Sequence, residues 1–134
     1  MSAGEFELIE RHFAALGAAR DDVILGVGDD AALLVAPPGC RLMVASASAS
    51  GDAQPEAVAL DCFHRAARAL RAVGAIPAWL TLALSLERVD EPWVARFAIA
   101  LDRACREAGV RVVGGDTTAG VSAVTIFLTG IEPA

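Results

Sequence analysis

The sequence predicts an α+β domain in which helices cover one face of a mixed sheet. Helical and strand-like patterns follow one another in the order helix, two or three strands, helix, strand, helix, two strands. Crossovers between the later strands place parallel and antiparallel neighbours in one sheet, with the helices on one face. Hydrophobic residues make up 55% of the 134 residues and the mean hydropathy is +0.51, so the uncovered face is expected to be a protein–protein interface. The length suits one domain over residues 1–134.

The first predicted helix lies near the N-terminus. Ser2 and Glu5 form a capping box at its start, and Gly17 is a stop signal at its end. Its apolar face consists of Phe6, Ile9, Phe13 and Leu16.

Three short strands are expected next. They span residues 23–25, 31–35 and 41–45, and the Pro-Pro-Gly turn at 37–39 is expected to join the last two as a hairpin. Residues 46–54 consist almost only of Ser, Ala, Gly and Asp. Because they lack periodicity and bulky side chains, they are expected to form a mobile loop.

Two longer helices alternate with the remaining strands. The first is expected over 55–73 and is ended by Gly74, whereas the second is capped by Asp90 and ended by Gly109. The strands between and after them are expected at 79–86, 111–113 and 124–131, the first of which alternates strictly between leucine and small residues.

Two glycine–aspartate segments could carry chemistry. Residues 26–30 read Gly-Val-Gly-Asp-Asp between two expected strands, and residues 114–118 read Gly-Gly-Asp-Thr-Thr directly after another. Glycines allow backbone amides to approach a phosphate, and carboxylates at strand ends suit Mg²⁺. Each segment alone also fits ordinary turn chemistry. The pair within one small domain favours a nucleotide and metal site.

Charge and cysteine content restrict the partners. The net charge of −6 disfavours nucleic acid and anionic membranes as partners. The three cysteines match no zinc pattern and suit a reducing cytoplasm as small buried side chains. Neither a signal peptide nor an apolar run long enough to cross a bilayer is evident.

The two segments, read in context, resemble the thiamine-monophosphate kinase family. Four stretches carry the likeness: Gly4-Glu5-Phe6 with Leu8-Ile9, Gly28-Asp29-Asp30-Ala31-Ala32, Gly74-Ala75-Ile76-Pro77-Ala78-Trp79-Leu80, and Gly114-Gly115-Asp116-Thr117-Thr118. They cover the family's N-terminal domain only. More distantly, the same domain is similar to those of aminoimidazole ribonucleotide synthetase and hydrogenase-maturation proteins.

The resemblance implies a four-stranded mixed sheet whose open face forms a barrel in a homodimer. It further implies transfer of the ATP γ-phosphoryl group to thiamine monophosphate, with Mg²⁺ as cofactor and a second domain completing the site. Carried over to this sequence, Asp29, Asp30, Ser46 and Asp116 are candidate metal ligands. Gly115 and Asp116 are candidate nucleotide contacts, and no catalytic residue is assigned.

Other motifs of the family are altered. Its Ser-Thr-Asp motif reads Ala45-Ser46-Ala47 here, so a metal aspartate is replaced by Ala47. Its substrate loop is replaced by residues 48–52, and its Asn-Leu-Ser-Asp helix motif reads Ala66-Ala67-Arg68-Ala69. The chain stops at Ala134, where the C-terminal domain is expected to begin.

Three hypotheses follow. The first is a degenerate, dimeric and non-catalytic binding or regulatory module. The alternative is an ATP- and Mg²⁺-dependent thiamine-phosphate kinase, or half of one, that works with a separate partner chain. The third is a purely structural or heteromeric partner, which pairs with an intact kinase through the shared sheet face. Too few carboxylates remain to gather the cations that a triphosphate brings, which favours the first hypothesis.

Overall fold

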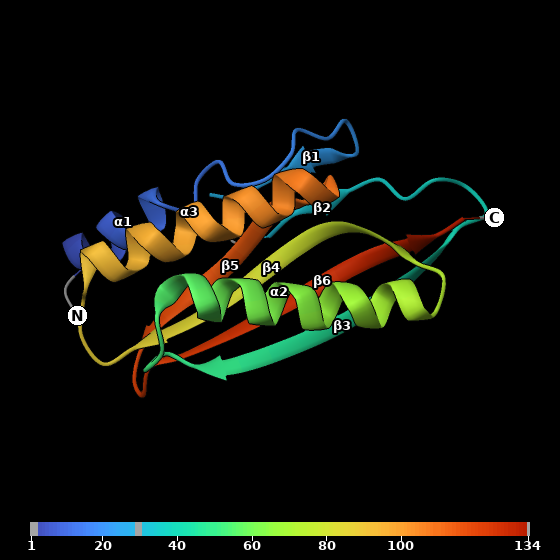
Figure 1. Cartoon of the computed structure of the whole chain (residues 1–134). Coiled ribbons are helices and arrows are strands. Elements are labelled where there is room, and N and C mark those ends of the chain that lie inside the picture. Colours follow the sequence, from blue (N-terminus) through green and yellow to red (C-terminus); the bar gives the residue numbers. More distant parts are fainter. Residues whose placement is uncertain (1–2, 29–30, 134) are drawn as a thin grey trace.

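The computed structural model describes residues 3–28 and 31–133. The predicted cap Ser2 and the candidate ligands Asp29 and Asp30 therefore lie outside the described residues. Figure 1 shows the elements, which in chain order are α1 (Ala3–Arg11), β1 (Val23–Leu25), β2 (Leu33–Leu34), β3 (Arg41–Ser50), α2 (Pro55–Ala72), β4 (Ile76–Leu86), α3 (Glu91–Ala108), β5 (Arg111–Ala119) and β6 (Ala123–Glu132).

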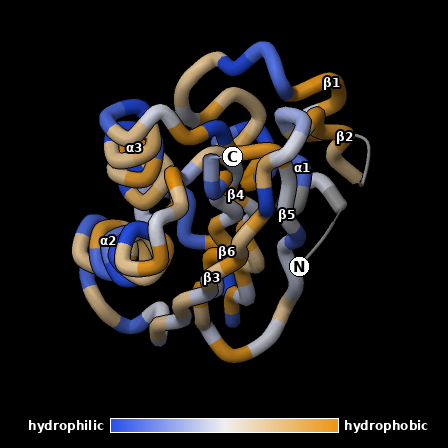
Figure 2. Tube along the Cα trace, turned by 90° about the vertical axis from the view of Figure 1, so that its right-hand side faces the viewer, coloured by the Kyte–Doolittle hydropathy of each residue, from blue (hydrophilic) through white to orange (hydrophobic). Residues whose placement is uncertain are grey.

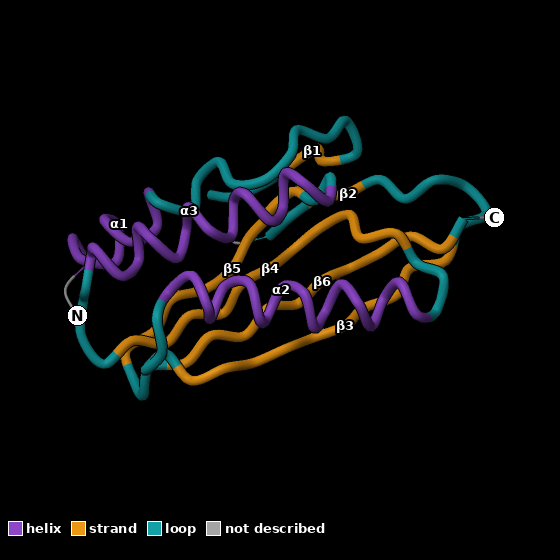
Figure 3. Tube along the Cα trace, viewed as in Figure 1, coloured by secondary structure: helices purple, strands orange, loops and turns teal. Residues whose placement is uncertain are grey.

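The main sheet has four strands in the order β3-β6-β4-β5 (Figure 3). Strand β6 pairs antiparallel with both β3 and β4, whereas β4 and β5 are parallel because α3 connects them as a crossover. This arrangement confirms the predicted four-stranded mixed sheet. Strands β1 and β2 form a separate antiparallel ribbon.

The helices α2 and α3 pack on one face of this sheet, as predicted, and the ribbon lies toward the other (Figure 2). The leucines of β4 alternate with small residues, so Leu80, Leu82 and Leu84 point into the core beneath the helices. Helix α1 adds Ile9, and Phe13, two residues beyond the helix, meets Phe97 of α3 edge to face. One continuous apolar core therefore joins all three helices to the sheet.

The ends of α3 follow the predicted signals, whereas α1 ends at Arg11 and not at the expected stop Gly17, because residues 12–15 form turns. The Asp90 carboxylate accepts a hydrogen bond from the Trp93 backbone N–H at 3.2 Å, so it is the N-cap of α3. Gly109 ends α3 with a φ of 71°, in the left-handed region. No helix among residues 3–28 and 31–133 is long and apolar enough to cross a membrane.

The opposite face of the sheet is largely open. Val23 and Leu34 of the ribbon pack on Trp79 and cover one corner. Away from that corner, Val44 on β3 and Phe127 on β6 remain 67% and 41% exposed. An apolar area thus lies on the face that the helices leave uncovered.

Two further predictions in the first half of the chain are wrong. Residues 31–35 and 41–45 do not form a hairpin, because β2 pairs with β1 while all ten residues of β3 pair with β6. The expected loop at 46–54 is a strand as far as Ser50. Its alanines, such as Ala47, pack beneath α2 and its serines face away, so small residues let the helix approach the strand closely.

Candidate functional site

A cavity of about 220 Å³ brings the two glycine–aspartate segments together. The loop between β1 and β2 contributes Gly26–Gly28, Ala31 and Ala32, and β5 contributes residues 112–117. Thr81 and Leu82 of β4 and two residues of the α1 region complete the lining. Gly115 and Asp116 therefore share one cavity with Gly28.

Strand β5 determines the geometry of its side of the cavity. The strand continues through residues 114–118 rather than ending at 113, because these residues pair with β4 as far as Ala119. Asp116 lies opposite Ala83 and is exposed on the open face. An added Cβ at Gly115 would lie 2.1 Å from the Leu82 carbonyl oxygen. Glycine at 115 is thus required by the close approach of β4.

The loop side of the cavity also depends on glycine. Gly28 has a φ of 123°, a backbone conformation that residues with a Cβ rarely adopt. A Cβ placed there meets nothing within 4 Å, so space is left in front of this backbone. Such a segment can approach a ligand closely with its backbone amides.

Carboxylates dominate the charge of the cavity. Among its described lining residues, Glu10 and Asp116 are acidic and no side chain is basic. A phosphate ligand would therefore need a cation as its counter-charge, and carboxylate oxygens are the ligands that Mg²⁺ prefers. Glu10 was not predicted from the sequence, because it lies off the apolar face of α1 and nothing local shows that α1 borders β5.

The other candidate positions that the structure describes do not line this cavity. Ser46 lies on edge strand β3, three strand positions from β5, which corresponds to about 14 Å between backbones. Ala47 is buried under α2, whereas Ala69 and Arg68 are exposed on that helix. Within the described part of the chain, no group of three or more His, Cys, Asp or Glu side chains could hold a metal ion.

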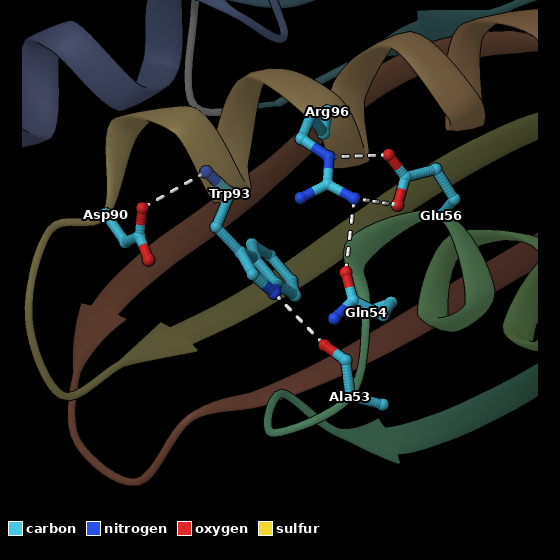
Figure 4. A network of polar contacts seen from close by, with 6 residues as sticks. All are labelled: Ala53, Gln54, Glu56, Asp90, Trp93 and Arg96. Atoms are coloured by element: carbon cyan, nitrogen blue, oxygen red, sulfur yellow. Dashed lines mark hydrogen bonds and ion pairs between the residues drawn. The ribbon is translucent and has the colours of Figure 1, made fainter.

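A second hollow lies between the N-termini of α2 and α3 (Figure 4). The Trp93 indole N–H donates to the Ala53 carbonyl oxygen at 3.2 Å. The Arg96 guanidinium binds both carboxylate oxygens of Glu56 and the amide oxygen of Gln54, and it holds the pKa of Glu56 below its usual value. These contacts anchor residues 53–56, part of which had been predicted to be a mobile loop.

The three cysteines are free thiols, and none of them lines the cavity. Cys62 and Cys105 are buried, as expected for small apolar side chains, whereas Cys40 is partly exposed and departs from that expectation. Burial raises the pKa of the Cys105 thiol to about 12 and also raises that of Cys62. Buried thiols of this kind are inert rather than nucleophilic at neutral pH.

Comparison with known proteins gives consistent matches. The family model for the N-terminal domain of AIR synthase related proteins matches residues 28–131. Thiamine-monophosphate kinase of Salmonella typhimurium is 39% identical over 140 residues, which are 100% of this chain and 43% of the relative. The Escherichia coli K12 enzyme is 38% identical over 139 residues, which are 99% of this chain and 43% of the relative.

Solved structures agree with these relatives. The thiamine-monophosphate kinase structure from Stenotrophomonas maltophilia K279a superposes with a TM-score of 0.78 at 29% identity, over 93% of this chain and 40% of that one. A structure of AaThiL complexed with AMPPCP and TMP has a TM-score of 0.66 at 26% identity, over 72% and 34% of the two chains. The chain thus spans less than half the length of the curated relatives that it matches.

Proposed function

Because this chain belongs to the family defined by the N-terminal domain of AIR synthase related proteins, we propose that it is a degenerate thiamine-monophosphate kinase-like domain. In this proposal it is a dimeric, non-catalytic binding or regulatory module. One observation carries the proposal: the described lining of the cavity offers only two carboxylates, those of Glu10 and Asp116, to metal ions. Phosphoryl transfer depends on positioning and on charge neutralisation by metal ions, so a shortage of such ligands removes catalysis before it removes binding.

The ligand of the cavity, in this proposal, is a nucleotide whose phosphates arrive with Mg²⁺. Gly28 leaves room for phosphate oxygens near the backbone, and Asp116 supplies a hard oxygen ligand to the ion. The described lining offers no basic side chain, so binding is expected to require the metal. The relative solved with AMPPCP supports a nucleotide as the ligand class.

The partner, in this proposal, is a second copy of the chain bound through the open face of the sheet. Val44 and Phe127 are exposed there although both are large and apolar. The helices cover only the other face, so a second sheet could stack on this one without displacing them. Stacking would remove these apolar side chains from water.

Two measurements test the proposal. The purified chain, incubated with Mg²⁺, ATP and thiamine monophosphate, should form no thiamine diphosphate, while the Escherichia coli kinase serves as positive control. Calorimetry should show that AMPPCP binds only when Mg²⁺ is present. The variant Asp116→Asn should weaken this binding, whereas Asp52→Asn, an exposed carboxylate outside the cavity, should not.

Product formation would contradict the non-catalytic assignment. If product appears with the chain alone, the chain is a kinase. If product appears only after addition of a separately expressed C-terminal domain of a relative, the chain is half of one. If AMPPCP binds neither with nor without Mg²⁺, a nucleotide is not the ligand of the cavity.

A further inference from the structure

Three side chains outside the cavity lining form a polar cluster. Arg20 binds Asp22 through two nitrogens, at 2.9 Å from Nε to Oδ1 and 2.7 Å from Nη2 to Oδ2. The Trp79 indole N–H donates to the same Oδ1 at 3.0 Å, and the Arg20 guanidinium lies 5.7 Å from the centre of the Trp79 ring. Arg20 also donates to the Gly109 carbonyl oxygen at 2.8 Å.

The cluster ties together elements that are distant in the sequence. Gly109 is the C-terminal cap of α3, and Trp79 belongs to the central strand β4. Asp22 directly precedes β1, and its backbone carbonyl accepts from the Val35 N–H, just beyond β2, at 2.8 Å. One residue thereby fastens both strands of the β1–β2 ribbon to the sheet, at the end of the ribbon opposite its connecting loop.

The ribbon needs such an attachment. It consists of strands of three and two residues, and isolated two-stranded ribbons are at best marginally stable in water. Its outward side chains Ile24 and Leu33 are exposed, so apolar packing comes from the inward Val23 and Leu34 on Trp79. Charge-assisted hydrogen bonds in a partly buried place add a directional restraint to that packing.

The loop carried by this ribbon forms one wall of the cavity, through residues 26–28 with Ala31 and Ala32. We propose that Arg20, Asp22 and Trp79 are positioning residues that hold this loop against β5 and so set the shape of the cavity. They act through the ribbon, since none of the three lines the cavity itself. The inference deepens the proposed function, because it names what pre-organises the same binding site.

Hydrogen exchange followed by mass spectrometry tests the proposal without any ligand. In Asp22→Asn, amides of residues 23–35 should exchange about tenfold faster, the loss expected when a charged hydrogen bond is weakened. Amides of α2 should keep their rates. The matched control is Asp21→Asn, an exposed neighbour with the same charge change, which should leave the loop as in the wild type.

A second variant keeps the proposal testable if Asp22→Asn does not fold. Trp79→Phe keeps an aromatic ring under the ribbon but removes the indole N–H with the five-membered ring. Because the Arg20–Asp22 ion pair is retained, exchange of the same amides should accelerate to a smaller extent than in Asp22→Asn. In a Trp93→Phe background, Trp79 is the single tryptophan of the chain, and its fluorescence emission maximum should shift when Asp22→Asn is introduced. Unchanged exchange in 23–35, or equal acceleration throughout the molecule, would overturn the proposal.

Binding of AMPPCP with Mg²⁺ gives the link to function. Asp22→Asn should raise the dissociation constant about tenfold, while Asp21→Asn should not change it. If the wild type binds no nucleotide, the proposed ligand fails, but the exchange experiment still decides whether the cluster positions the loop. If the exchange effect appears and binding is unaffected, the cluster holds the ribbon without shaping the cavity, and the inference is wrong.

Discussion

Ala47 and Asp116 lie on opposite faces of the same sheet. Ala47 pairs with Ile126 on the helix-covered face, and both are buried in the core. Asp116 pairs with Ala83 and is exposed on the open face. A carboxylate at position 47 would therefore not join Asp116 around one ion. Alanine at this position, where the resemblance implies an aspartate, is buried in the core beneath α2.

The first prediction concerns restoration of the implied metal ligand. Ala47→Asp should lower the free energy of unfolding by about 3 kcal/mol, because it places an unpaired charge under α2. Urea denaturation at pH 7 measures the effect. Ser46→Asp is the control, since its side chain is exposed on the opposite face of β3. A stable Ala47→Asp variant that gains Mg²⁺ binding would contradict the packing argument.

The second prediction separates two neighbouring glycines. Gly115→Ala should destabilise the domain by about 1 to 3 kcal/mol, because its Cβ would collide with the Leu82 carbonyl oxygen. Gly114→Ala should stay within about 0.5 kcal/mol of the wild type, since a Cβ at 114 meets nothing within 4 Å. Thermal unfolding of both variants measures the difference. Equal stability would show that β4 can move away from β5 at little cost.

The third prediction tests self-association through the open face. Val44→Asp should convert the proposed dimer to a monomer, because it would bury a charge between two apolar surfaces. Light scattering at several protein concentrations measures the mass. Val121→Asp is the matched control, since Val121 is 78% exposed in the turn between β5 and β6. Loss of the dimer in both variants, or in neither, would place the interface elsewhere.

Long periodic segments could be predicted from the sequence. Helix α3 carries an apolar stripe between Asp90 and Gly109, and both ends lie where these signals place them. Strand β4 alternates leucines with small residues because one face meets helices and the other does not. In such segments the local pattern and the tertiary environment agree, so residue spacing alone is informative.

The pairing partners of the strands and the residues that line the cavity could not be predicted in this way. The serines and alanines of β3 have little strand propensity, and their strand is determined by pairing with β6 and by the approach of α2. The Pro-Pro-Gly turn suggests a hairpin between residues 31–35 and 41–45. Instead, Leu34 packs on Trp79 and β2 pairs with β1. Glu10 reaches the cavity only because α1 docks beside β5, which is a tertiary contact.

The fourth prediction concerns thiol reactivity. Cys40 is partly exposed and should react with a thiol reagent in the native protein, whereas Cys62 and Cys105 should not. Burial raises the pKa of Cys105 to about 12, so almost no reactive thiolate forms at pH 8. Mass spectrometry should find one modification per chain in buffer and three in denaturant. Native modification of Cys105 would indicate that α3 opens readily.

The last prediction is a pH dependence centred on Asp22. Its hydrogen bond from Arg20, assisted by that from Trp79, holds the pKa of the Asp22 carboxyl below the usual value of 3.8. The folded state therefore binds this proton less readily than the unfolded chain. The resulting stability is fully present above about pH 4 and is lost as pH falls through the lowered folded-state pKa.

Urea denaturation of the wild type and of Asp22→Asn, followed from pH 7 down to about pH 3, measures that contribution. The difference in unfolding free energy between the two proteins should be constant at neutral pH and should shrink below about pH 4, because protonated Asp22 can no longer pair with Arg20 as an anion. Asp21→Asn should run parallel to the wild type throughout, since its carboxylate is exposed. A difference that grows on acidification would mean that the Asp22 carboxyl is more easily protonated in the folded state, and the ion pair with Arg20 would then not stabilise the loop.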